Sequence, residues 1–111
     1  MCDQNEALEI LEKTVTGCLP ILPISEAYLY GSYARGDYDH ESDVDIFLTS
    51  PLSMHDIEKK RWDISGVASD LFLDHDIVVS VCVRPETDFQ PEHNPYYENI
   101  AREGIRYLKT I

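Results

Sequence analysis

EAYLYGSYARGDYDHESDVDIFLT, residues 26–49, contains two apolar segments separated by a polar loop. The first segment, EAYLY, is predicted to form a short strand that ends at Gly31-Ser32. The second, DVDIFLT at 43–49, alternates between its two faces, as a strand on a buried sheet does. The loop YARGDYDHES is polar and rich in turn formers, which predicts one helical turn followed by irregular chain.

Two aspartates open the second of these strands. Asp43 and Asp45 lie two residues apart, so both carboxylates point to the same face. Magnesium prefers one or two carboxylates together with substrate phosphates, and a third acid on a neighbouring strand would complete a site for two metal ions. Asp76, expected at the head of a strand over 76–84, is the candidate, with Asp74 as an alternative and a solvated strand end as the simpler interpretation.

The glycine–serine pair between the strands suggests a phosphate site. A glycine at position 31 lets the backbone approach a ligand closely. Ser32 and the amides after it would lie at the start of a helical turn, where free N–H groups can bind phosphate. Arg35, one turn further on, is a candidate for a charged phosphate contact. Its alternative partner is a surface carboxylate, Asp37 or Asp39.

The remaining sequence completes the predicted fold. Apolar spacing, caps and the β-branched run DIVVSVCVR indicate further helices and strands. Their order predicts an α+β fold of two layers, with helices packed on one face of a mixed sheet. Helices are expected at 4–18, 54–72 and 95–103, and strands at 26–30, 43–49, 76–84 and, as a short edge strand, 105–109.

Composition limits the classes of function. The 111 residues fit a single domain over 1–111, and 43% hydrophobic residues are typical of a globular chain. A protein that binds DNA or long RNA needs a basic surface, which a chain with a formal charge of −12 does not offer. The chain has no apolar run of membrane-spanning length, and its acidic start does not resemble a signal peptide. A cytoplasmic protein is therefore expected.

These motifs resemble the signature of the nucleotidyltransferase superfamily, in which Gly-Ser is followed about ten residues later by Asp-x-Asp. Here ten residues separate the pair at 31–32 from Asp-Val-Asp at 43–45. GSYARGDYDHESDVDIFL resembles the minimal nucleotidyltransferases in particular, and YYENIAREGIRYL resembles their C-terminal segment. The resemblance implies the polymerase-β-like palm fold, with metal ligands at Asp43 and Asp45 and a third carboxylate at Asp76.

The resemblance also implies a reaction. A nucleoside monophosphate, most often AMP from ATP, would pass to an acceptor hydroxyl with the help of two Mg²⁺ ions, or Mn²⁺ in their place. Gly31, Ser32 and Arg35 would hold the β- and γ-phosphates of the nucleoside triphosphate. Many minimal members pair with a HEPN-domain RNase toxin and adenylylate one of its tyrosines. A HEPN partner, or a homodimer mate that supplies the acceptor, is therefore expected.

Two other functions stay open. A non-catalytic antitoxin would neutralise a HEPN partner by complex formation alone, although the intact acids argue against a decayed site. A transferase of the antibiotic-modifying type usually carries a further helical domain, for which 111 residues leave little room. The sequence identifies neither the acceptor, nor the nucleotide base, nor the oligomeric state.

Overall fold

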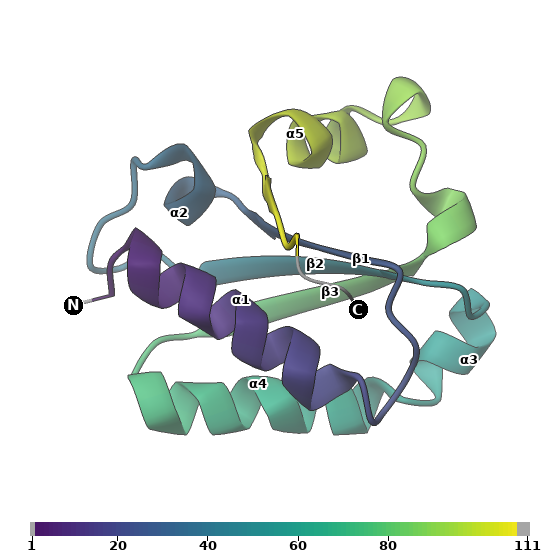
Figure 1. Cartoon of the computed structure of the whole chain (residues 1–111), viewed down its shortest axis with the longest axis horizontal. Helices are drawn as coiled ribbons and strands as arrows, with labels where there is room; N and C mark the ends of the chain where they lie inside the picture. The colour runs from purple at the N-terminus through teal and green to yellow at the C-terminus, as the bar shows by residue number, and fades with distance from the viewer. Residues whose placement is uncertain (1, 109–111) are drawn as a thin grey trace.

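A four-stranded mixed sheet lies at the centre of the computed structural model, which describes residues 2–108 (Figure 1). The strand order is β3-β2-β1-β4. The inner strand β1 is antiparallel to both of its neighbours, whereas β2 and β3 are parallel. β3 is therefore one edge of the sheet and β4 the other. The strands are β1 (Glu26–Tyr30), β2 (Val44–Ser50), β3 (Val79–Pro85) and β4 (Ile105–Arg106).

Several helices begin at a side chain that caps their first turn. The Asp3 side chain accepts a hydrogen bond from the N–H of Glu6, and the Asn94 side chain accepts one from the N–H of Tyr96. Within residues 2–108 no helix is both long enough and apolar enough to cross a membrane. The helices are α1 (Gln4–Cys18), α2 (Ser32–Arg35), α3 (Met54–Glu58), α4 (Arg61–His75) and α5 (Pro95–Glu103), with 3-10 turns η1 (Glu86–Asp88) and η2 (Pro91–His93).

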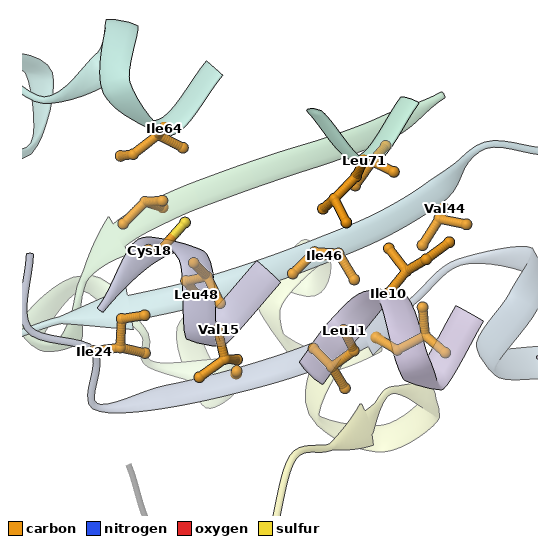
Figure 2. Packing of buried hydrophobic residues seen from close by; sticks show 14 of the residues in the cluster. Ile10, Leu11, Val15, Cys18, Ile24, Val44, Ile46, Leu48, Ile64 and Leu71 are labelled. Atoms are coloured by element: carbon orange, nitrogen blue, oxygen red, sulfur yellow. The ribbon is translucent and has the colours of Figure 1, made fainter. Parts of the chain in front are cut away.

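The main hydrophobic core lies between the sheet and the two long helices. In Figure 1, α4 lies below the sheet and α1 runs obliquely down toward it, and both helices contribute to this core. The strand β2 contributes every second residue to this core, as its alternation predicts. Figure 2 shows the packing, with Ile10, Leu11 and Val15 from α1, Val44, Ile46 and Leu48 from β2, and Ile64 and Leu71 from α4.

The opposite face of the sheet has a smaller aromatic core. Tyr28 of β1 and Phe47 of β2 are buried there under Ile100 of α5, with Phe89 and Tyr97 packed around them. Figure 1 shows α5 above the sheet. The predicted α+β fold with a mixed sheet is confirmed. All helices were expected on one face of the sheet, but α5 packs on the opposite face from α1 and α4. Apolar rings on the second face of the sheet need cover, and α5 provides it.

Several predicted boundaries change in the structure. The single helix expected over 54–72 is divided into α3 and α4 at 59–60, and α4 continues to His75. Asp76 then adopts a left-handed conformation with φ 54°, and its N–H bonds to the carbonyl of Phe72. This turn ends the helix, so β3 begins at Val79 and Asp76 is not at its head. Of the strand expected over 105–109, residue 109 lies outside the described residues.

Candidate active site

The end of β1 and the start of β2 bring the glycine–serine turn against an aspartate. Tyr30 is the register partner of Asp45 across the antiparallel pair. The chain then turns at Gly31, with φ 75° and ψ −153°, a conformation that only glycine adopts readily. A Cβ at position 31 would lie 2.5 Å from Oδ2 of Asp45. The Asp45 carboxylate therefore rests directly on the glycine backbone.

The first turn of α2 leaves two backbone donors beside this carboxylate. The N–H groups of Ala34 and Arg35 both donate to the carbonyl of Gly31, each at 3.1 Å. The N–H groups of Ser32 and Tyr33 make no hydrogen bond with any residue between 2 and 108. Tyr33 is 1% exposed, and its buried ring anchors the turn in the main core. The turn thus presents fixed, unpaired donors that an anion can accept.

The two aspartates repel one another. Asp45 is half-buried and Asp43, just before β2, is exposed. Burial raises the pKa of Asp45, the charge of Asp43 raises it further, and the charge of Arg35 lowers it. Burial and the negative charge of Asp43 disfavour the ionised carboxylate, whereas the positive charge of Arg35 favours it. A divalent cation between the two carboxylates would relieve their repulsion, so this pair fits a magnesium site.

Arg35 makes the surface ion pair that was its alternative role. Its Nε lies 3.2 Å from Oδ2 of Asp37, and its Nη1 lies 3.7 Å from Oε2 of Glu103 on α5. Asp39 is not its partner among the described residues. Because the Arg35 side chain is 44% exposed, these pairs contribute little and can be exchanged for another anion.

The structure does not bring Asp76 to the aspartate pair. Asp76 is exposed, in the left-handed turn that caps the C-terminus of α4. In the described part of the chain no three His, Cys, Asp or Glu side chains are close enough to hold a metal ion. The predicted three-carboxylate cluster is absent there, because the left-handed turn at Asp76 precedes the strand. The residue beside Asp45 on β3 is Ser80.

Comparison with known proteins identifies the family. Residues 9–108 match the model of the nucleotidyltransferase domain. The chain belongs to the nucleotidyltransferase domain family. It is 36% identical over 84 residues to MJ0141 of Methanocaldococcus jannaschii, named as a protein adenylyltransferase, and this match covers 74% of the chain and 83% of that relative.

Solved structures share the fold of this nucleotidyltransferase. A toxin–antitoxin structure with AMP-PNP has a TM-score of 0.61 at 20% identity, covering 89% of this chain and 73% of that one. A minimal nucleotidyltransferase has a TM-score of 0.54 at 20% identity, covering 94% and 95% of the two chains. The predicted family and enzyme class are confirmed.

Sequence reasoning missed an aromatic wall in this nucleotidyltransferase. The hydroxyls of Tyr30 and Tyr96 lie 2.9 Å apart, with their rings edge to face. Burial raises the pKa of Tyr30, the bond to Tyr96 raises it further, and the nearby charge of Asp45 also contributes. A pocket of about 220 Å³ adjoins the wall and is also lined by Gly31, Arg35, Asn99, Ile100 and Glu103. The available signal was the alternation that places Tyr30 on the Asp45 face.

Proposed function

We propose that this nucleotidyltransferase moves AMP from ATP to a hydroxyl group of a protein. The observation that carries the proposal is the contact of the Asp45 carboxylate with the Gly31 backbone, beside two unpaired N–H groups. This juxtaposition offers a place for a cation and for a phosphate chain within one site. The relative MJ0141, named as a protein adenylyltransferase, supports both the donor and the acceptor class.

The triphosphate is assigned to the turn. The N–H groups of Ser32 and Tyr33 and the Ser32 hydroxyl donate to phosphate oxygens, while Gly31 keeps the backbone open. Arg35 exchanges its exposed carboxylate partners for the phosphates. The AMP-PNP present in the toxin–antitoxin structure supports a nucleotide at this fold's site. The pocket beside Tyr30 and Tyr96 is then available for the nucleoside.

Asp43 and Asp45 are assigned to Mg²⁺. Their carboxylates have the hard oxygens that this ion prefers, and their mutual repulsion falls when it is bound. When bound, Mg²⁺ supplies charge neutralisation for the triphosphate and for the departing pyrophosphate. The Gly31 contact holds Asp45 in position, so the protein's own part in catalysis is orientation and preorganised charge.

The acceptor is assigned to a HEPN-domain protein that forms a toxin–antitoxin pair with this chain, with a tyrosine hydroxyl as the receiving group. The toxin–antitoxin neighbour in the structure comparison supports a pair of this kind. The alternative is a binding antitoxin without catalysis. The intact carboxylate pair beside the glycine–serine turn favours the enzyme.

The test incubates the chain with α-labelled ATP, Mg²⁺ and a purified candidate HEPN protein. Label on the HEPN protein, lost in Asp45→Asn, supports the enzyme. Asp70→Asn is the matched control, because this exposed aspartate lies on α4, outside the proposed metal and nucleotide sites. A tight complex that never acquires label would support the binding antitoxin instead, and label that persists in Asp45→Asn would remove the metal assignment.

A further inference from the structure

We infer that the open edge of β3 is a docking site for an acidic, extended segment of the acceptor protein, which joins the sheet as an added strand. The acceptor role rests on the proposed function. The docking itself does not, since it depends only on the exposed edge, the groove beside it and the charges around it.

The backbone of β3 has an unused side. Among the strands of residues 2–108, β3 pairs with β2 alone, and the N–H of Val44 donates to the carbonyl of Val78 at 3.0 Å. In a parallel ladder alternate residues point both backbone groups away from the partner strand, so those of Val79, Val81 and Val83 face outward. Within residues 2–108 the hydrogen bond recorded on this side comes from Nη1 of Arg84, which donates to the carbonyl of Val83 at 2.9 Å. The edge is therefore open to strand addition.

A groove runs along this edge. Its volume is about 400 Å³, and it lies between β3 and the helices α3 and α4. Apolar side chains from both helices and from the strand form much of its lining. The apolar lining residues include Met54, Ile57, Ile64 and Val81, and the charged ones are Glu58, Arg61 and Arg84. A strand laid on β3 would place alternate side chains in this groove, which is how strand addition obtains specificity.

The charged side chains that line the groove favour an acidic occupant. Two arginines, Arg61 and Arg84, line the groove against one acid, Glu58, in a chain whose net charge is −12. Among the described residues Lys60 and Arg84 make no ion pair, and Arg61 has only an exposed pair at 3.9 Å with Glu58. Such loose pairs yield readily to a better partner.

An exposed aromatic side chain lies next to these charges. Trp62 is 88% exposed at the start of α4, where it lines a second hollow with Arg61 and Ser65. Tryptophan and arginine are among the residue types enriched in the binding hot spots of protein interfaces. A partner on the groove therefore has an apolar anchor as well as charged contacts.

The docking site leads to the candidate active site. Ser80 of β3 is exposed and is the register partner of Asp45, so the two side chains share one face. An added strand would lie about 10 Å from β2, two strand spacings away. A tyrosine on it, lying across Ser80, would carry its hydroxyl toward Asp45. That oxygen bonds to the α-phosphorus of ATP, the bond to the bridging oxygen of the β-phosphate breaks, pyrophosphate leaves, and the hydroxyl proton passes to solvent.

The test measures binding separately from transfer. The probe is a seven-residue peptide, the length of β3, that alternates valine with glutamate and contains one tyrosine. The double variant Arg61→Glu/Arg84→Glu is expected to weaken its binding about tenfold or more, because like charges then face each other. Lys13→Glu, on α1, is the matched charge control and keeps wild-type affinity. Trp62→Ala weakens binding, and Leu73→Ala, also exposed on α4, does not.

Amide exchange locates the peptide. Its binding is expected to protect the N–H groups of Val81 and Val83, in Asp45→Asn as well as in the wild type. The inference is overturned if the peptide does not bind at millimolar concentration, or if the double variant binds it equally well. Preference for a lysine-substituted peptide or for RNA also overturns it, as does a solution dimer that covers β3. Peptide binding without label transfer to the HEPN protein would instead count against the proposed function alone.

Discussion

Gly31→Ala tests the contact on which the candidate site depends. An alanine at φ 75° and ψ −153° occupies a region that non-glycine residues avoid, at a cost of about 1–3 kcal/mol in the free energy of unfolding. The added Cβ would also lie 2.5 Å from Oδ2 of Asp45. The carboxylate is the flexible partner, so it must move by roughly 1 Å to reach an ordinary contact. Displacement of a reacting group by about 1 Å lowers a rate by about 100-fold.

The assay pairs label transfer from ATP with urea unfolding. Gly31→Ala is expected to lose both transfer and stability. Gly36→Ala is the matched control, since its glycine has φ 90° but no atom within 4 Å of the added Cβ. It should lose about 1–2 kcal/mol of stability while folded protein keeps its transfer rate. If Gly31→Ala transfers label as well as Gly36→Ala does, the placement of Asp45 by Gly31 has no catalytic consequence and the reasoning is refuted.

Three further predictions concern charge and helix stability. Since burial and Asp43 raise the pKa of Asp45 above 3.8, the contribution of this group to stability is lost as pH rises through that raised pKa. Asp45→Asn should therefore unfold at a higher temperature than wild type at neutral pH, match it below pH 3.8, and transfer no label. Asp76→Asn should keep the fold, because asparagine tolerates the left-handed conformation, and should keep most transfer activity, because Asp76 belongs to no metal-binding cluster among the described residues. A loss of activity as large as that of Asp45→Asn would restore Asp76 as a metal ligand. Gly66→Ala, inside α4 with no atom near the added Cβ, should raise the free energy of unfolding by about 0.5–1 kcal/mol, and an unchanged urea midpoint would contradict this.

Local signals account for the parts of the fold that could be predicted. The helices at 4–18 and 95–103 and the strand at 26–30 have the predicted bounds, since caps, prolines and periodicity lie within each segment. The alternation around Asp45 also holds, with Phe47 on the opposite face from Val44 and Ile46. A strand pattern depends only on near neighbours, so these features need no knowledge of the rest of the chain.

The misplaced features depend on contacts that are distant in sequence or on single dihedral angles. Asp76 was expected on a strand because the apolar run that follows it has no marker for a left-handed turn. The pair of Tyr30 and Tyr96 joins residues 66 positions apart, and no local pattern indicates such a contact. The position of α5 on the second face likewise follows from the need to cover Tyr28 and Phe47, which only the folded sheet exposes together.

The groups proposed to bind the donor phosphates and those proposed to bind the acceptor protein come from different segments of the chain. The groups assigned to ATP phosphates and Mg²⁺ lie within residues 31–45, whereas the groove beside β3 is built from residues 54–84. Mutations in the later segment can therefore redirect the enzyme to a different protein without disturbing nucleotide use. Paralogous copies of such a chain could diverge in target while retaining one chemistry. An exchange of residues 54–84 alone would transfer the target and leave each recipient its own phosphate site and the nucleoside pocket beside Tyr30 and Tyr96.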